Sequence, residues 1–176
     1  MKYMQNGGFQ NHPLMRLTLF WTEVFLTGLW ITNFFFYFSK MGLTPQSVVD
    51  YYLGSAELYT QPRSFGSMLE VTHMHLPMMA IVVLLLTHLL IFAPMSDQTK
   101  VGMICTAFGS ALLSEAAGWL VRFVHPGFAP LKILSFLVFQ AILGYLLLAL
   151  AIFLARSGSS GRATKRNKKN ADIEQA

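Results

Sequence analysis

Three histidines lie within one apolar stretch of the chain: His73, His75 and His88. An ionisable side chain inside such a stretch is costly unless it is paired or bound to something, so these residues indicate a site. His73 and His88 are 15 residues apart. On an α-helix that spacing places them within about 60° of one face and about 22 Å apart along the axis. Imidazoles so arranged can bind metal at two depths of a membrane.

This arrangement resembles the ligand helices of membrane b-type cytochromes, in which one helix serves two haems stacked across the bilayer. The resemblance implies haem b as cofactor, with a second imidazole from another helix as the other axial ligand of each iron. His125, at the outer end of a later apolar segment, is the expected partner of His73 or His75. Only His12 remains as a partner for His88. Because no second segment carries two spaced histidines, we expect one haem rather than two.

Copper is the alternative cofactor for the same histidines. In an extended chain His73 and His75 share one side, whereas on a helix they point about 160° apart. If the helix began only at Pro77, these two residues and His125 would form a three-imidazole copper site at the outer face. The capping box formed by Ser67 and Glu70 favours an earlier helix start and therefore argues against copper.

Two carboxylates and one arginine accompany the histidines in apolar segments. Glu23 is expected near mid-membrane, level with His88, and Glu115 in the outer half. Either carboxyl group can be a neutral packing group, since burial favours its protonated form. In the functional alternative one of them accepts a proton beside a quinol or orients His88. Arg122 either reaches the headgroups or holds haem propionates.

The segments that must position these residues are membrane spans. The chain has 176 residues, of which 54% are hydrophobic and only 12% charged, so it cannot cover a water-facing surface as a soluble enzyme domain does. A helix needs about 20 apolar residues to cross a bilayer. Four segments qualify, and we predict an all-α, four-transmembrane-helix bundle with spans at about 14–39, 68–92, 101–124 and 131–155.

Basic residues set the predicted orientation. Nine of the 13 Lys and Arg residues fall in the N-terminal segment 1–13 and its junction with the first span, the loop between spans two and three, and the tail 156–176. Both termini are therefore expected on the cytoplasmic side, and the protein in the inner membrane of a bacterium.

The tail has no apolar period and is predicted to be disordered. In the outer loop 40–67, Thr44 and Pro45 predict a short helix that continues to Leu53.

The third span is predicted to lie inside the bundle, because small residues recur along it at three- and four-residue steps. They are Ala107, Ser110, Ala111, Ser114, Ala117 and Gly118.

These patterns predict a b-type cytochrome subunit of a redox or respiratory complex, transferring electrons between quinol and a partner on the outer side. No phosphate loop, nucleophile elbow or zinc-protease helix is present, so catalysis by this chain alone is not expected. The expected partners are the lipid bilayer, other membrane or periplasmic redox subunits and a quinone, without nucleic acid. The alternatives are a copper-binding membrane subunit and a cofactor-free accessory subunit that stabilises a larger complex.

Overall fold

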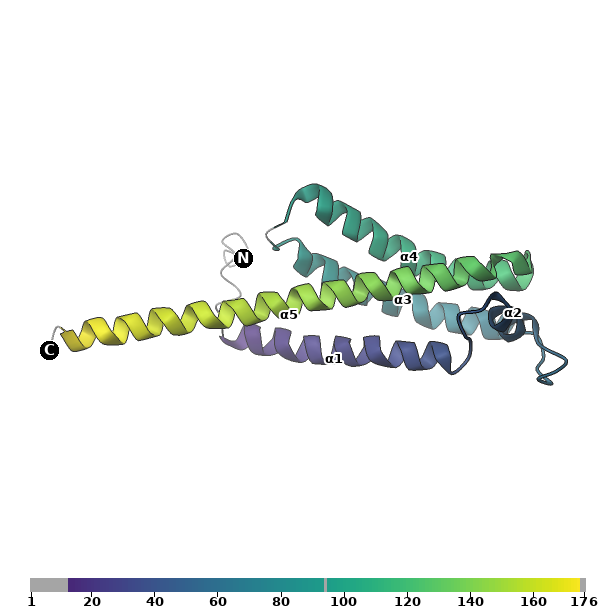
Figure 1. The fold of residues 1–176 in the computed structure, drawn as a ribbon, viewed down its shortest axis with the longest axis horizontal. Coiled ribbons are helices and arrows are strands. Elements are labelled where there is room, and N and C mark those ends of the chain that lie inside the picture. Colours follow the sequence, from purple (N-terminus) through teal and green to yellow (C-terminus); the bar gives the residue numbers. More distant parts are fainter. Residues whose placement is uncertain (1–12, 94, 175–176) are drawn as a thin grey trace.

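The computed structural model describes residues 13–93 and 95–174, with side chains described as far as Ala155. These residues form a bundle of helices (Figure 1). In chain order the elements are α1 (Pro13–Phe38), α2 (Pro45–Leu53), α3 (Phe65–Leu90), α4 (Asp97–Phe123), the 3-10 turn η2 (Pro126–Phe128) and α5 (Ala129–Glu174).

Four stretches are long and apolar enough to cross a membrane: Pro13–Phe38, Phe65–Leu90, Asp97–Phe123 and Pro126–Ala155. The protein is therefore a multi-pass helical membrane protein, which confirms the predicted fold class. Successive spans run in opposite directions, so α1 and α4 end, and α3 and α5 begin, at the end of the bundle that carries α2 (Figure 1). We call this the α2 end.

Hydroxyl side chains fix where the helices begin, because they satisfy backbone N–H groups that lack a partner in the first turn. Thr44 accepts a hydrogen bond from Ser47 N and precedes Pro45, as predicted for the short loop helix. Ser64 accepts from Ser67 N, so α3 begins at Phe65. The predicted capping box of Ser67 and Glu70 is therefore wrong, and the helix starts earlier than expected.

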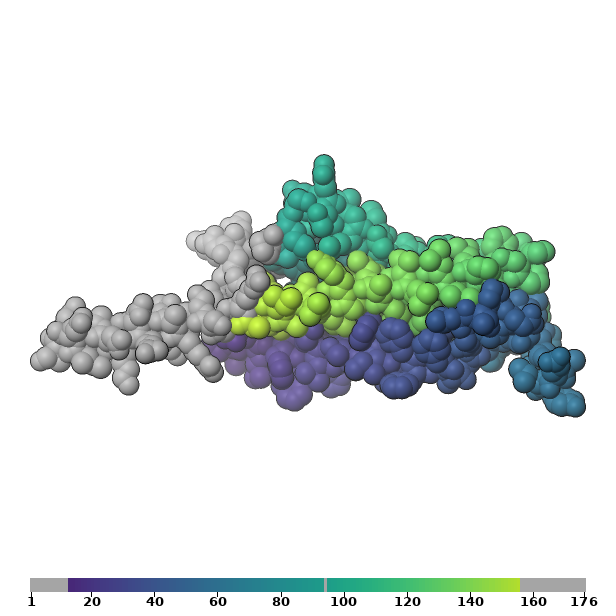
Figure 2. All heavy atoms as spheres, viewed as in Figure 1, coloured from purple at the N-terminus to yellow at the C-terminus, as the bar shows by residue number. Residues whose placement is uncertain are grey.

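α5 is the helix against which the others pack. α4, α1 and α3 all contact it, whereas α1 and α3 make little contact with each other. On the face seen in Figure 2, α5 lies between α1 and the first half of α4. The small residues of α4 are all buried, as predicted, and they let the α4 backbone approach α5 closely.

The α2 end has an aromatic core of its own. Tyr37 of α1 stacks on Phe136 of α5, with ring centroids 3.7 Å apart. Tyr52 of α2 is buried against α4 at Gly118, where an added Cβ atom would lie 2.7 Å from the Tyr52 hydroxyl. Only glycine at this position allows α2 to pack so closely onto the bundle.

The last helix differs from the prediction. The structure continues α5 to Glu174, through the segment 156–174 that was expected to be disordered. The sequence prediction considered only whether this segment can build a core of its own. Extending an existing helix costs far less than nucleating a new one, and no proline interrupts the chain here.

Candidate functional site

The central polar contact of the bundle joins α3 to α4. His75 Nδ1 lies 2.9 Å from Glu115 Oε1. Thr72 Oγ1 donates to the other carboxylate oxygen at 3.4 Å and accepts from Trp119 Nε1 at 2.8 Å. The carboxylate is thus held from two sides, and the His75–Glu115 pair has a fixed geometry.

Helical spacing explains why these side chains meet. Thr72 and His75 are three residues apart on α3, and Glu115 and Trp119 are four apart on α4, so each pair shares a helix face. His75 is ten residues from the start of α3 and Glu115 eight from the end of α4. At 1.5 Å per residue the pair lies about 12 to 15 Å from the α2 end, well within the hydrocarbon region.

A buried lysine lies beside the pair. Lys132 of α5 is 8% exposed, and its Nζ donates to the carbonyl oxygen of Ser114 at 2.7 Å and to the Ser114 hydroxyl at 3.3 Å. Lys132, Ser114, Glu115 and His75 line one cavity of about 120 Å³. An amine, a carboxyl group and an imidazole therefore meet in a small space inside the bundle.

A second, apolar cavity of about 150 Å³ adjoins the first. It lies between α1 and α3, with Phe139 and Leu143 of α5 among the residues lining it. Asn33 and His75 line both cavities and, apart from the indole N–H of Trp30, supply the polar groups among the described residues around the second one. Its rim includes Leu29 and Met78, which are largely exposed, so the cavity opens between α1 and α3 toward the lipid. We call it the α1–α3 groove.

The other candidate histidines do not gather around the pair. His73 and His88 are exposed on α3. His88 makes an edge contact with Phe92, with ring centroids 5.8 Å apart. His125 is exposed, and its Nδ1 accepts from Gly127 N at 2.9 Å. Among the described residues no three His, Cys, Asp or Glu side chains are placed to hold a metal ion together. His12 lies outside the described residues.

Glu23 and Arg122 have different surroundings from those considered in the sequence. Glu23 is half-buried on α1, and its buried Oε2 has no hydrogen-bond partner in the described part of the chain. Arg122 Nε donates to the carbonyl oxygen of Arg63 at 2.7 Å. Arg122 thus ties the loop before α3 to the end of α4, a structural role that the sequence analysis did not consider.

Sequence reasoning missed three residues of the site. Lys132, Thr72 and Trp119 were not among the candidate residues predicted from the sequence. A signal was available, because Thr72 stands three residues before His75 and Trp119 four after Glu115. Nothing in the sequence indicates that α5 directs Lys132 toward Ser114.

Comparison with known families adds one finding. Residues 42–161 match a family described as a transmembrane helical domain, Aq_1264_TM. The chain belongs to this family. The match extends from α2 through the fourth span, so the pairing of His75 with Glu115 lies within the Aq_1264_TM domain, while α1 precedes it. Neither the curated proteins nor the solved structures gave a match.

Proposed function

We propose that this Aq_1264_TM protein is the quinol-binding membrane subunit of a redox complex. The observation that carries the proposal is the position of the His75–Glu115 pair, at the inner end of a groove that opens to lipid. An apolar molecule with a hydroxyl or carbonyl end group, dissolved in the bilayer, is the ligand that such a site suits.

The groove has an apolar part and a polar part, which suit the two chemical parts of a quinol. Its walls are formed by Leu26, Met79, Val82 and Phe139, which suit a ring and the start of an isoprenoid tail. Its polar end offers Asn33 and His75. Because α1 and α3 make little contact with each other, the groove can widen for a ring without breaking a packed interface.

The pair supplies a proton acceptor. With the proton of Nδ1 donated to Glu115, the Nε2 of neutral His75 is left as an acceptor, and no described residue occupies it. Oxidation of a quinol to a quinone releases two electrons and two protons. His75 Nε2 accepts the protons one after the other, Glu115 stabilises the imidazolium between transfers, and the electrons pass to a redox centre on a partner subunit.

The protons have a polar route away from His75. The cavity that holds Glu115 and Lys132 continues to Lys40 and Arg63 at the α2 end. We therefore propose that protons leave on that side. From the distribution of basic residues, this is the outer side of a bacterial inner membrane.

Among the described residues, no two histidines are placed to hold a haem b iron as an axial pair. An iron between two helices needs two imidazoles that face one space. His75 lines the two cavities described above without a second histidine, and its Nδ1 is engaged by Glu115. We accordingly assign the electron carrier to a partner subunit. The copper site required an extended chain at His73, and α3 is helical there.

A binding measurement tests the proposal. The full chain in lipid nanodiscs is titrated with a decyl-substituted benzoquinone, with the fluorescence of Trp30, which lines the groove, as one readout and calorimetry as another. Loss of one hydrogen bond costs about 1 kcal/mol or more, so His75→Leu is expected to weaken binding at least about 5-fold.

His73→Leu is the matched control, because it changes the same residue type two positions away on the exposed face of α3. It is expected to bind the quinone as the parent does. Equal weakening in both variants, or no saturable binding by the parent, contradicts the proposal and favours a cofactor-free accessory subunit.

A further inference from the structure

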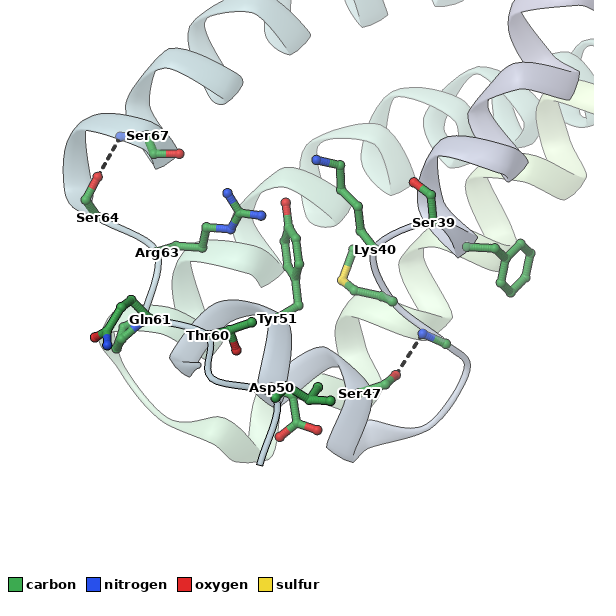
Figure 3. Close-up of a pocket in the computed structure, with 15 residues that line it drawn as sticks. Ser39, Lys40, Ser47, Asp50, Tyr51, Thr60, Gln61, Arg63, Ser64 and Ser67 are labelled. Atoms are coloured by element: carbon green, nitrogen blue, oxygen red, sulfur yellow. Dashed lines mark hydrogen bonds between the residues drawn. The ribbon is translucent and has the colours of Figure 1, made fainter. Parts of the chain in front are cut away.

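A wide hollow lies at the α2 end and shares Lys40 and Arg63 with the cavity that holds the His75–Glu115 pair. Its volume is about 770 Å³, within the range of about 300 to 1,000 Å³ that is typical of ligand pockets. The end of α1, α2 and the loop that leads into α3 form its walls (Figure 3). We call it the basic bowl, after Lys40 and Arg63, the two cations that line it.

Both cations lie near one aromatic ring. The Arg63 guanidinium carbon is 4.3 Å from the Tyr51 ring centroid, and Lys40 Nζ is 5.9 Å from it. Lys40 Nζ also lies 4.8 Å from the ring of Phe36. The Tyr51 ring stands between the two cationic groups in Figure 3. An aromatic face stabilises each cation without neutralising it.

Neither cation has a carboxylate partner. Within residues 13–93 and 95–155 no Asp or Glu oxygen lies within 4.0 Å of Lys40 or Arg63, although two other ion pairs form in that part of the chain. Asp50 lines the basic bowl, but its Oδ1 accepts from Gln46 Nε2 at 2.8 Å, and Figure 3 shows it away from both cationic groups. The two positive charges are therefore available to a ligand.

The backbone holds Arg63 in place. Its N–H donates to the Tyr52 carbonyl at 3.0 Å, and its own carbonyl accepts from Arg122 at 2.7 Å. The backbone N–H of Lys40 donates to the Tyr37 carbonyl at 3.0 Å. The two cations thus project from anchored positions, which reduces the entropy lost when they bind a shared ligand.

Hydroxyl groups add further donors. The hydroxyls of Tyr51 and Ser67 face the same space and have no hydrogen-bond partner among the described residues. Two cations and two hydroxyls offer many donors and little acceptor capacity, which is the pattern that recognises a phosphate oxyanion. The ends of α1 and α3 also place these groups at the depth of lipid headgroups.

We propose that the basic bowl binds a phosphate group, with Lys40 and Arg63 as its charge partners. The phosphate belongs either to the headgroup of an anionic phospholipid or to a soluble phosphate compound. Lys40 and Arg63 also line the cavity that holds Glu115, but phosphate binding does not require that the α1–α3 groove bind a quinol.

The test uses the full chain in detergent micelles and two probes. Calorimetry measures the binding of dihexanoyl phosphatidylglycerol and, separately, of inorganic phosphate. The double variant Lys40→Gln/Arg63→Gln is expected to bind at least ten-fold more weakly than the parent. Lys100→Gln removes one cation at the opposite end of the bundle, where it pairs with Asp97, and is expected to bind within two-fold of the parent. Circular dichroism and thermal unfolding confirm that the variants fold.

Saturable binding of both probes, weakened by the double variant, supports a phosphate site open to soluble and lipid ligands. Binding of the lipid alone, weakened in the same way, identifies a lipid headgroup as the source, and binding of inorganic phosphate alone identifies a soluble ligand. The proposal is overturned if neither probe shows saturable binding, or if the parent and the folded double variant bind with equal affinity.

Discussion

A double-mutant cycle on His75 and Glu115 tests whether the central pair contributes to stability. His75→Ala, Glu115→Ala and the double variant are compared with the parent. Charge-assisted hydrogen bonds contribute about 1.5 to 3 kcal/mol, whereas hydrogen bonds between membrane helices average about 0.6 kcal/mol. The 2.9 Å distance and the 14% exposure of the Glu115 side chain place the pair in the stronger class. Because the His75 side chain is 43% exposed, we expect a coupling energy near its lower limit, about 1.5 kcal/mol.

The assay is reversible unfolding in bicelles, driven by steric trapping or by a rising concentration of a denaturing detergent. Circular dichroism monitors the unfolding. A parallel cycle with His73→Ala and Glu115→Ala serves as the control. It is expected to be additive within about 0.5 kcal/mol, because His73 has no contact with the carboxylate in the structure. A coupling for His75 and Glu115 that is no larger than this control refutes the reasoning that the pair is a charge-assisted contact.

Three further predictions concern the α2 end. Gly118→Ala is expected to destabilise the protein by about 1 to 3 kcal/mol through its clash with Tyr52, whereas Gly109→Ala, with no atom within 4 Å of the new Cβ, is expected to be neutral or stabilising by up to about 1 kcal/mol. Thermal unfolding of the two variants checks this, and equal effects would contradict the packing described. Burial raises the pKa of the Tyr52 phenol above its usual value, so the unfolded chain releases this proton at lower pH than the folded one. Stability is therefore unaffected by this group below about pH 10 and falls by up to about 1.4 kcal/mol per pH unit above it, and denaturation of Tyr52→Phe at pH 9 to 11 is expected to show a shallower fall. Arg122→Leu removes the bond to the Arg63 carbonyl, and amide exchange across residues 54–63 is expected to accelerate about ten-fold or more, as mass spectrometry would measure. Unchanged exchange would mean that Arg122 does not hold this loop.

The spans were predictable because each one needs a long apolar segment and little else. Hydrophobic length locates all four, and the small residues of α4 indicate its buried face, although α5 is the helix against which the others pack. The start of α3 was placed too late, because Ser64 and Ser67 both have the character of a cap and only the structure shows that Ser64 caps the helix. The extension of α5 beyond the apolar segment was missed because the prediction considered only whether that segment can build a core of its own.

The candidate site was predictable only in part. His75 and Glu115 were both singled out as polar residues in spans, but their pairing depends on the relative rotation of α3 and α4. Spacing along one helix cannot supply this rotation, and it favoured His73 and His88, which the structure leaves exposed. Lys132 illustrates the same limit, because its partner is a carbonyl oxygen of another helix, which no side-chain pattern reveals.

The slight burial of α1 has a mechanical consequence. Among its residues only Tyr37, near its end, is buried, whereas α3, α4 and α5 share the main core. The first helix is attached to α5, where Trp30 Nε1 donates to the Gln140 carbonyl oxygen at 3.0 Å, and makes little contact with α3. Separation of α3 from α1 along the groove would therefore break few contacts, so ligands of different width can reach Asn33 from the bilayer without disturbing the core shared by α3, α4 and α5.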